Sequence, residues 1–271
     1  MASTYPKIGL ALGSGGPRGL AHIGIMKVLL EHNIPIDYIA GASIGAMIGG
    51  FYAVNNDIDW VEKVIAANDW RKILSLYKPA FGKGLVSGTN VLKYIESHVG
   101  HVDFDELKTP LAIMATDIRK GEAVCIQKGR LSTAIRASTS VPVLFEPAER
   151  EGRLLADAGL SVPVPVDVAR EMGAGFVIAV NLDADYFSGR PKSKGSLSLY
   201  EIADNSIMSL RQHLAHANTK TADFIIEPPV GKAEWKEFAD AKKGIKEGEK
   251  YMRSKIPALM KALENFDRNA C

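Results

Sequence analysis

The chain has 271 residues, which is long for one domain, although α/β folds often reach this length as a single domain. Its hydrophobic content of 46%, charged content of 24% and net charge of +2 are typical of a globular protein and give no electrostatic reason to expect a nucleic-acid partner. The only cysteines, Cys125 and Cys271, argue against a disulfide framework or a zinc site and favour a reducing compartment. No apolar run is long enough for a signal peptide or a membrane span, so we expect a cytoplasmic protein.

Short apolar runs alternate with helical patterns along the chain. The expected strands, in chain order, are residues 7–12, 36–43, 110–117, 123–127, 153–159, 176–182 and 223–228. The expected helices are residues 19–33, 44–54, 57–75, 88–99, 131–138, 198–217 and 233–265. This alternation indicates an α/β fold, with a mostly parallel central sheet covered by helices on both faces. The stretch 183–196 is expected to be a polar surface loop.

Small residues surround Ser43, where the second expected strand meets the helix after it. Residues 41–45, "GASIG", fit the pattern G-x-S-x-G, and a strand-to-helix junction is the context in which this pattern forms a nucleophile elbow. In such a turn the serine has strained backbone geometry and its Oγ stands above the sheet edge. The helix N-terminus also offers unpaired N–H groups to a developing oxyanion. The alternative is a packing contact between small residues, without catalysis.

A glycine-rich loop follows the first expected strand and opens the first helix. Residues 15–19, "GGPRG", supply backbone amides that can turn inward, with a proline that limits flexibility and one guanidinium alongside. An acyl-transfer enzyme needs about two such amides near its serine. The spacing does not fit the dinucleotide-binding pattern G-x-G-x-x-G, and no Walker-type sequence is present. A tight turn before a helix is the plainer interpretation.

A serine nucleophile needs a base, and the six histidines offer no good candidate. None follows an acid in a loop at a strand end, and exposure on a polar helix explains His213 and His216. Asp157 is the better candidate because a strand-like run ends there in Asp-Ala-Gly, and mostly aliphatic neighbours would raise the pKa of its carboxyl. An aspartate that only begins a turn is common, so both interpretations stay open.

The order of these motifs resembles the patatin-like phospholipases, and their bacterial members in particular. The resemblance includes the segment "ASTSVP" at Ala137–Pro142 and extends over residues 7–168. Residues 169–271 would supply the remaining strands and the C-terminal helices of the same compact domain. The family fold that the resemblance implies has three layers, α/β/α.

The resemblance also implies roles for single residues. Ser43 would be the nucleophile and Asp157 its direct partner in a Ser-Asp dyad, with no third residue. The oxyanion hole would consist of the amides of Gly15, Gly16 and Arg18. Glycines that support these motifs are Gly19, Gly41, Gly45 and Gly159. The family usually has Asp-Gly-Gly or Asp-Gly-Ala at the aspartate, so Ala158 departs from the pattern and would strain the turn if the position requires a positive φ.

The implied reaction is hydrolysis of a lipid ester, in a phospholipid or lysophospholipid, through an acyl-enzyme on Ser43 and without a metal or organic cofactor. A set of apolar residues in an irregular segment would line an acyl groove or contact a membrane surface, unless it belongs to the core: Leu74, Leu76, Tyr77, Phe81 and Leu85. Two alternatives remain. A lipid-binding or regulatory protein with weak turnover fits the same fold, and a dinucleotide-binding oxidoreductase would explain the glycine loop but not the serine elbow.

Overall fold

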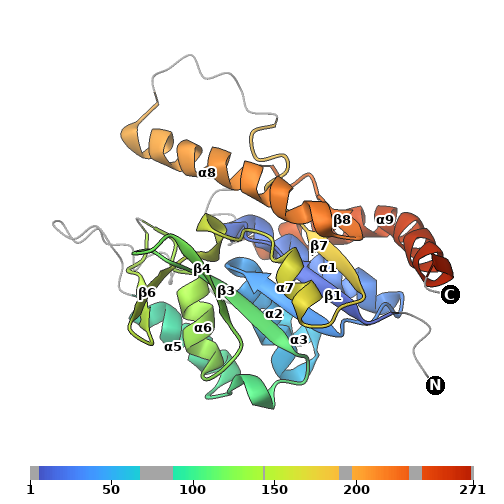
Figure 1. The fold of residues 1–271 in the computed structure, drawn as a ribbon, viewed down its shortest axis with the longest axis horizontal. Helices are drawn as coiled ribbons and strands as arrows, with labels where there is room; N and C mark the ends of the chain where they lie inside the picture. Colours follow the sequence, from blue (N-terminus) through green and yellow to red (C-terminus); the bar gives the residue numbers. More distant parts are fainter. Residues whose placement is uncertain (1–5, 68–87, 143, 189–196, 232–239, 270–271) are drawn as a thin grey trace.

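The computed structural model describes residues 6–67, 88–142, 144–188, 197–231 and 240–269. A mostly parallel sheet lies at the centre, with helices on both faces (Figure 1). Its strand order is β5-β6-β3-β2-β1-β7-β8; β4 and β6 pair with β3 in the antiparallel sense. The strands are β1 Ile8–Leu12, β2 Tyr38–Ala42, β3 Leu111–Asp117, β4 Glu122–Ile126, β5 Ala148–Arg150, β6 Arg153–Ala156, β7 Phe176–Val180 and β8 Phe224–Ile226. The α/β/α fold expected from the sequence is confirmed.

The core has one main layer on each face of the sheet, because successive side chains of a strand point to opposite faces. On β1, Ile8, Leu10 and Leu12 belong to the larger cluster, whereas Ala11 belongs to a smaller one. The helices of the larger cluster are α1 Leu20–Glu31, α2 Ile44–Asn55, α3 Ile58–Ala67, α5 Thr89–Val99, α6 Leu131–Ser138 and α9 Ala241–Asn269. The helices of the smaller cluster are α7 Val166–Glu171 and α8 Leu199–Asn218.

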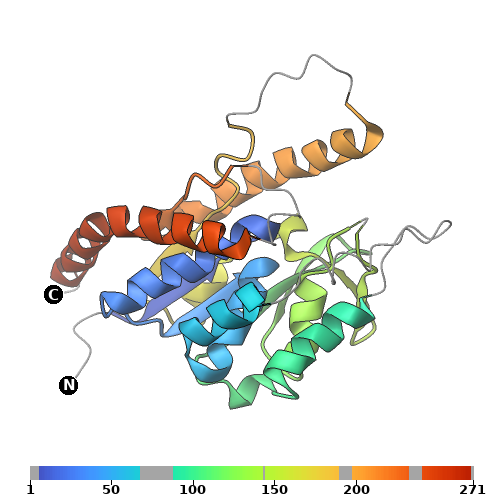
Figure 2. The same cartoon turned by 180° about the vertical axis from the view of Figure 1, so that it is seen from behind.

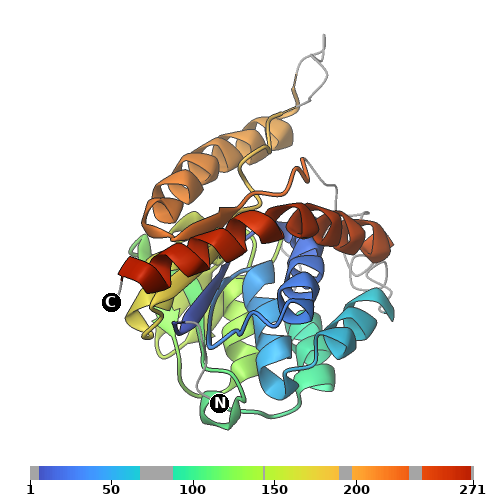
Figure 3. The ribbon, with the colours of Figure 1, turned by 90° about the vertical axis from the view of Figure 1, so that its right-hand side faces the viewer.

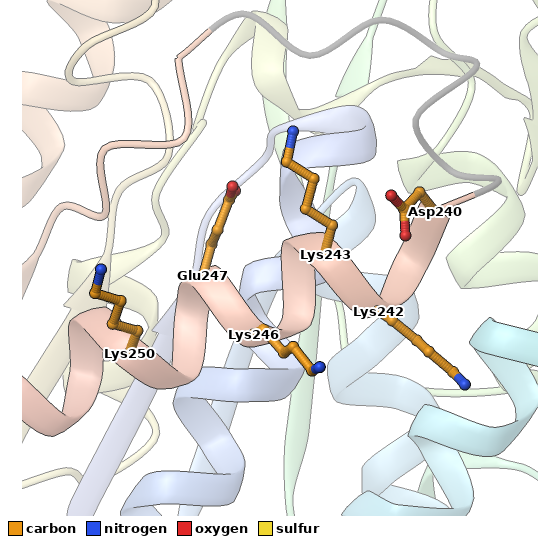
Figure 4. Close-up of a pocket in the computed structure, with 6 residues that line it drawn as sticks. All are labelled: Asp240, Lys242, Lys243, Lys246, Glu247 and Lys250. Carbon is orange, nitrogen blue, oxygen red and sulfur yellow. The ribbon is translucent and has the colours of Figure 1, made fainter.

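Two long helices lie on the outside of the molecule. Helix α9 runs along α1, as the views from behind and from the side show (Figures 2 and 3). Its first turns bury Ile245 and present charged side chains to solvent on two sides (Figure 4): Lys242, Lys243, Lys246, Glu247 and Lys250. Helix α8 projects from the body at its N-terminal end (Figure 1), so Leu199 and Leu210 are exposed, while Ala215 near its other end is buried.

Most expected elements are present, with ends that differ by a few residues. Strand β5 and helix α7 were missed; α7 begins directly after Pro165, at a position where a helix accepts proline because no backbone N–H is needed there. The strand expected at 153–159 ends at Ala156, because a short 3-10 helix follows. The helix expected at 57–75 is described only as far as Ala67. Strands from both sides of residue 168 pair directly in one sheet, and α7 spans that residue, so the boundary between 7–168 and 169–271 stays a prediction.

Candidate active site

Ser43 lies at the sharp junction between β2, which ends at Ala42, and α2, which begins at Ile44. Its backbone has φ 54° and ψ −118°, a conformation that is strained for any residue with a side chain. The turn is tight enough that a Cβ atom on Gly45 would collide with the carbonyl oxygen of Leu12 at the end of β1. The small residues around Ser43 therefore follow from the approach of β1, β2 and α2, and the geometry is that of a nucleophile elbow.

Asp157 comes directly after β6 and meets the serine across the sheet edge. The Ser43 hydroxyl donates a hydrogen bond of 2.6 Å to Asp157 Oδ2, and the Gly159 amide donates one of 2.8 Å to Asp157 Oδ1. Both Ser43 and Asp157 are buried. Burial raises the pKa of the Asp157 carboxyl above its usual range, although the bonds from Ser43 and Gly159 act in the opposite direction.

The end of α6 and the segment after it hold both members of this pair. The Ser43 amide donates to Ser138 Oγ at 2.9 Å, and the Asp157 amide donates to the carbonyl of Ser140 at the same distance. From β3, the Thr116 hydroxyl donates to the Asp157 carbonyl at 2.9 Å. The sequence predicts no role for these three residues, although Ser138 and Ser140 belong to the segment "ASTSVP".

The glycine loop after β1 presents two backbone amides that no described residue uses. The amide of Gly13 donates to Val180 and that of Ser14 to Pro163, whereas no acceptor among the described residues takes the amide of Gly15 or Gly16. Gly16 has φ 55°, which glycine adopts without strain, and it begins the 3-10 helix η1 Gly16–Gly19. Backbone amides without an acceptor, close to a nucleophile elbow, are a requirement of an oxyanion hole.

The Arg18 side chain does not lie free beside this loop. It is buried, and its guanidinium donates from Nε to the Gly15 carbonyl at 3.2 Å and also to the Leu182 carbonyl. A third donor group of the same guanidinium binds Asp183 Oδ1 at 2.7 Å. The sequence placed one guanidinium alongside the amides; in the structure it contacts the loop through the carbonyl of Gly15.

The expectation of a polar surface loop at 183–196 is wrong for its first residues. Asp183 and Tyr186 are buried, because Asp183 accepts hydrogen bonds from two arginines, Arg18 and Arg211. Tyr186 lies under the Arg18 guanidinium, 4.9 Å from the ring centroid. Residues 189–196 lie outside the described part of the chain.

Comparison with known proteins shows which family shares these motifs. A sequence model of the patatin-like phospholipase family matches residues 10–170. The chain belongs to this family. An uncharacterized NTE family protein of Mycobacterium tuberculosis is 38% identical over 182 residues, which cover 67% of this chain and 50% of that protein. The neuropathy target esterase sws of Drosophila melanogaster is 34% identical over 191 residues, which cover 66% of this chain and 13% of that protein.

The chain spans about half the length of the mycobacterial relatives it matches. Among solved structures, VipD from Legionella pneumophila superposes with a TM-score of 0.57 and 13% identity, over 93% of this chain and 67% of that one. This likeness shows the fold alone.

The Asp-Ala-Gly turn, in which this chain departs from the usual patatin-like pattern, has no positive φ at its alanine. Ala158 begins the 3-10 helix η3 Ala158–Leu160 and is not among the described non-glycine residues with positive φ. The strain considered for this position is therefore not present. Asp157 caps η3 by accepting from the Gly159 amide, so the turn keeps the carboxylate in place.

His22, His213 and His216 lie in helices. His22 is fully buried in α1, where its Nε2 donates to the Gly13 carbonyl at 2.8 Å, and burial lowers its pKa to about 4. His213 and His216 are exposed on α8.

Neither a cluster of potential metal ligands nor a helix long and apolar enough to cross a membrane was found among the described residues. The apolar residues proposed for an acyl groove, Leu74 to Leu85, lie outside the described part.

Proposed function

We propose that this chain is a serine acyl hydrolase that cleaves ester bonds of phospholipids or lysophospholipids through a Ser43-Asp157 dyad. The observation that carries the proposal is the 2.6 Å hydrogen bond from the Ser43 hydroxyl, in its strained elbow, to a buried carboxylate. Membership in the patatin-like phospholipase family supports the lipid ester as substrate class. Because such esters reside in membranes, the proposal includes peripheral contact with a membrane surface.

The reaction begins when Asp157 takes the proton of the Ser43 hydroxyl while Oγ attacks the ester carbonyl. The negative charge that develops on the carbonyl oxygen is stabilised by the amides of Gly15 and Gly16, with the Arg18 amide as the third proposed donor. Asp157 then passes its proton to the leaving alcohol. Water attacks the acyl-enzyme with Asp157 again as the base, which releases the fatty acid and restores Ser43.

The environment of Asp157 suits a base that works without histidine. A carboxylate with an ordinary pKa is a weak proton acceptor at neutral pH, and burial raises the pKa of this one. A raised pKa brings the carboxylate closer to the serine hydroxyl in proton affinity, which favours transfer in the transition state. The hydrogen bonds from Ser43 and Gly159 and the charge of Arg211 act against the rise in pKa, because each favours the ionised carboxylate that acts as base.

A strained Asp-Ala-Gly turn that displaced the carboxylate would favour the alternative of a lipid-binding or regulatory protein with weak turnover. Ala158 has no positive φ and the Ser43 to Asp157 bond is formed, so no observation favours that alternative. The dinucleotide-binding alternative gains no support either, because the glycine loop opens a single turn of 3-10 helix whose arginine is engaged with Asp183.

Labelling with a fluorophosphonate and turnover of a medium-chain ester test the proposal together. Ser43→Ala should abolish both while the protein stays folded, because alanine tolerates the backbone of the elbow as well as serine does. Asp157→Asn keeps the shape of the side chain but cannot accept the proton, so turnover should fall by several orders of magnitude. A double change of the exposed His213 and His216 to alanine is the control and should leave the rate near wild type.

Two outcomes contradict the proposal. Turnover retained in Ser43→Ala would show that another residue is the nucleophile. A histidine variant as inactive as Ser43→Ala would indicate a triad instead of the dyad.

A further inference from the structure

A buried ion cluster lies next to the candidate active site and links three separate parts of the chain. Asp183, just after β7, accepts from Arg18 at 2.7 Å through Oδ1. The same carboxylate accepts from Arg211 of α8 at 2.7 Å through Oδ1 and at 2.9 Å through Oδ2. The side chains are almost entirely buried, with 1% of Asp183, 3% of Arg18 and 15% of Arg211 exposed.

We propose that Asp183 and Arg211 are positioning residues for ester hydrolysis: they fix the glycine loop through Arg18 and set the charge environment of Asp157. The inference rests on the proposed function, because it concerns the same reaction. Neither residue belongs to the motifs that carry the family resemblance, and both follow the matched region 10–170.

The first arm of the cluster acts on the glycine loop. Arg18 Nε donates to the carbonyl of Gly15, and a second donor of the guanidinium binds the carbonyl of Leu182. A peptide bond is planar and trans, so its N–H points away from its C=O. When the Gly15 carbonyl is held against Arg18, the Gly16 amide of that same peptide unit must point the opposite way. Asp183 therefore orients a proposed oxyanion donor by holding the arginine that holds the carbonyl.

The second arm acts on Asp157. The space where a Cβ atom of Gly159 would lie is 2.9 Å from Asp157 Oδ1 and 3.0 Å from Arg211 Cδ. Glycine at 159 thus lets the Arg211 side chain approach the carboxylate that is bonded to Ser43. Any larger residue there would push the two apart.

The groups around Asp157 have opposite effects on the pKa of its carboxyl. The Ser43 hydroxyl from the start of α2 and the Gly159 amide stabilise the ionised carboxylate directly. Arg211 from α8 lowers the pKa of Asp157 through its charge, whereas burial and the negative charge of Asp183 raise it. From β3 and the loop after α6, the described residues that bond Asp157 do so through neutral groups, the hydroxyl of Thr116 and the carbonyl of Ser140. Two guanidiniums and two carboxylates together leave the buried site without net charge.

A purely structural ion cluster would stabilise the fold without tuning the reaction, and a second, more exposed aspartate-arginine pair provides the control. Asp223 accepts from Arg170 at 2.6 Å and from the Val177 amide at 2.7 Å, near the N-terminal end of β7. Asp183 follows the C-terminal end of the same strand. Asp223→Asn therefore removes an aspartate-arginine pair at the end of β7 that is remote from Ser43.

The experiment compares Arg211→Gln, Arg211→Lys, Asp183→Asn and Asp223→Asn with wild type. For each variant, kcat and KM for a medium-chain ester are measured over a range of pH, together with the melting temperature. Arg211→Gln should lower kcat by about a hundredfold with little change in KM, and should move the acid limb of kcat/KM to higher pH. Arg211→Lys keeps the charge but not the two parallel bonds, so kcat should fall while the acid limb stays in place.

Asp183→Asn removes a negative charge near Asp157, so its acid limb should move in the opposite direction, to lower pH, while kcat falls because Arg18 loses its anchor. Asp223→Asn should lower the melting temperature and leave both the acid limb and kcat near wild type. The inference would be overturned if Arg211→Gln left the acid limb of kcat/KM in place and lowered kcat no more than Asp223→Asn does. If Arg211→Gln does not fold, wild-type kcat in Arg211→Lys would overturn it instead.

Failure of the proposed function gives a different pattern. An inactive wild type, or an active Ser43→Ala, refutes the dyad and this inference with it. An active wild type that is silenced by Ser43→Ala, combined with unaffected Arg211 and Asp183 variants, refutes only the positioning roles.

Discussion

Ser138 is the side chain whose removal tests the elbow most directly without touching the reacting groups. Its Oγ accepts the Ser43 amide at 2.9 Å, and Ser138 itself is completely buried. Ser138→Ala leaves that amide without a partner in a place that water does not reach. The change is small in volume, so the lost hydrogen bond dominates its effect.

The magnitude follows from the unpaired amide and the strained serine. A buried donor without a partner costs about 1–3 kcal/mol, which should lower the melting temperature by roughly 2–4 °C for each kcal/mol. The positive φ of Ser43 costs on the order of 1–3 kcal/mol, and the bond to Ser138 helps to offset it. If the elbow relaxes by the same energy, the population with reactive geometry falls, and kcat should drop by about five- to 150-fold.

The assay is ester turnover with separate kcat and KM, paired with thermal unfolding. Ser132→Ala is the matched control, because Ser132 is a buried serine of the same helix whose hydroxyl bonds Glu96 at 3.4 Å and contacts neither Ser43 nor Asp157. It should lower the melting temperature slightly and leave kcat unchanged. A Ser138→Ala protein that melts earlier but keeps wild-type kcat would refute the argument, since the bond would then stabilise the fold and not the reactive geometry.

Three further changes probe the surroundings of the dyad. Gly16→Val should lower kcat about a hundredfold or more, because a β-branched residue disfavours the φ of 55° at this proposed oxyanion donor. An unchanged rate in a folded variant would show that the loop is only a tight turn. Gly45→Ala should lower the free energy of unfolding, measured in urea, by about 1–3 kcal/mol, because the new Cβ atom would collide with the Leu12 carbonyl oxygen. Alanine normally stabilises a helix relative to glycine, so a stabilised variant would contradict this close approach. The free energy of unfolding of the wild type should fall as the pH drops from about 6.5 towards 4, by up to about 1.4 kcal/mol per pH unit. In this range His22 binds a proton in the unfolded chain but not in the folded protein. If His22→Gln shows the same slope, His22 is not the cause.

The elbow and the glycine loop could be predicted from the sequence because each is a local feature. The G-x-S-x-G pattern lies within residues 41–45, at the end of an apolar run, so the sequence shows it without any distant contact. The role of Asp157 was harder to predict, because 114 positions separate it from Ser43 in the sequence. Its place at the end of an expected strand was the local signal for it. The resemblance of the ordered motifs supplied the pairing that no single motif contains.

Ser138, Asp183 and Arg211 could not be found in the same way. Their contacts are made across long stretches of sequence, with 95 positions between Ser43 and Ser138 and 165 between Arg18 and Asp183. Asp183 opens a stretch rich in glycine, serine and lysine, a composition typical of surface loops. Only the packing of α8 against η3 shows that Arg211 reaches this aspartate in the segment after β7.

The two positions after Asp157 in the Asp-Ala-Gly turn, Ala158 and Gly159, have different steric requirements. Ala158 is fully buried, and its methyl group packs with Ala42 and Met114, where glycine would leave a small gap. Gly159 has no such freedom, because a methyl group there would occupy the space between the Asp157 carboxylate and Arg211. The second position, and not the first, is therefore the one at which this chain requires glycine. Alanine next to Asp157 fills the core and leaves the approach of Arg211 open.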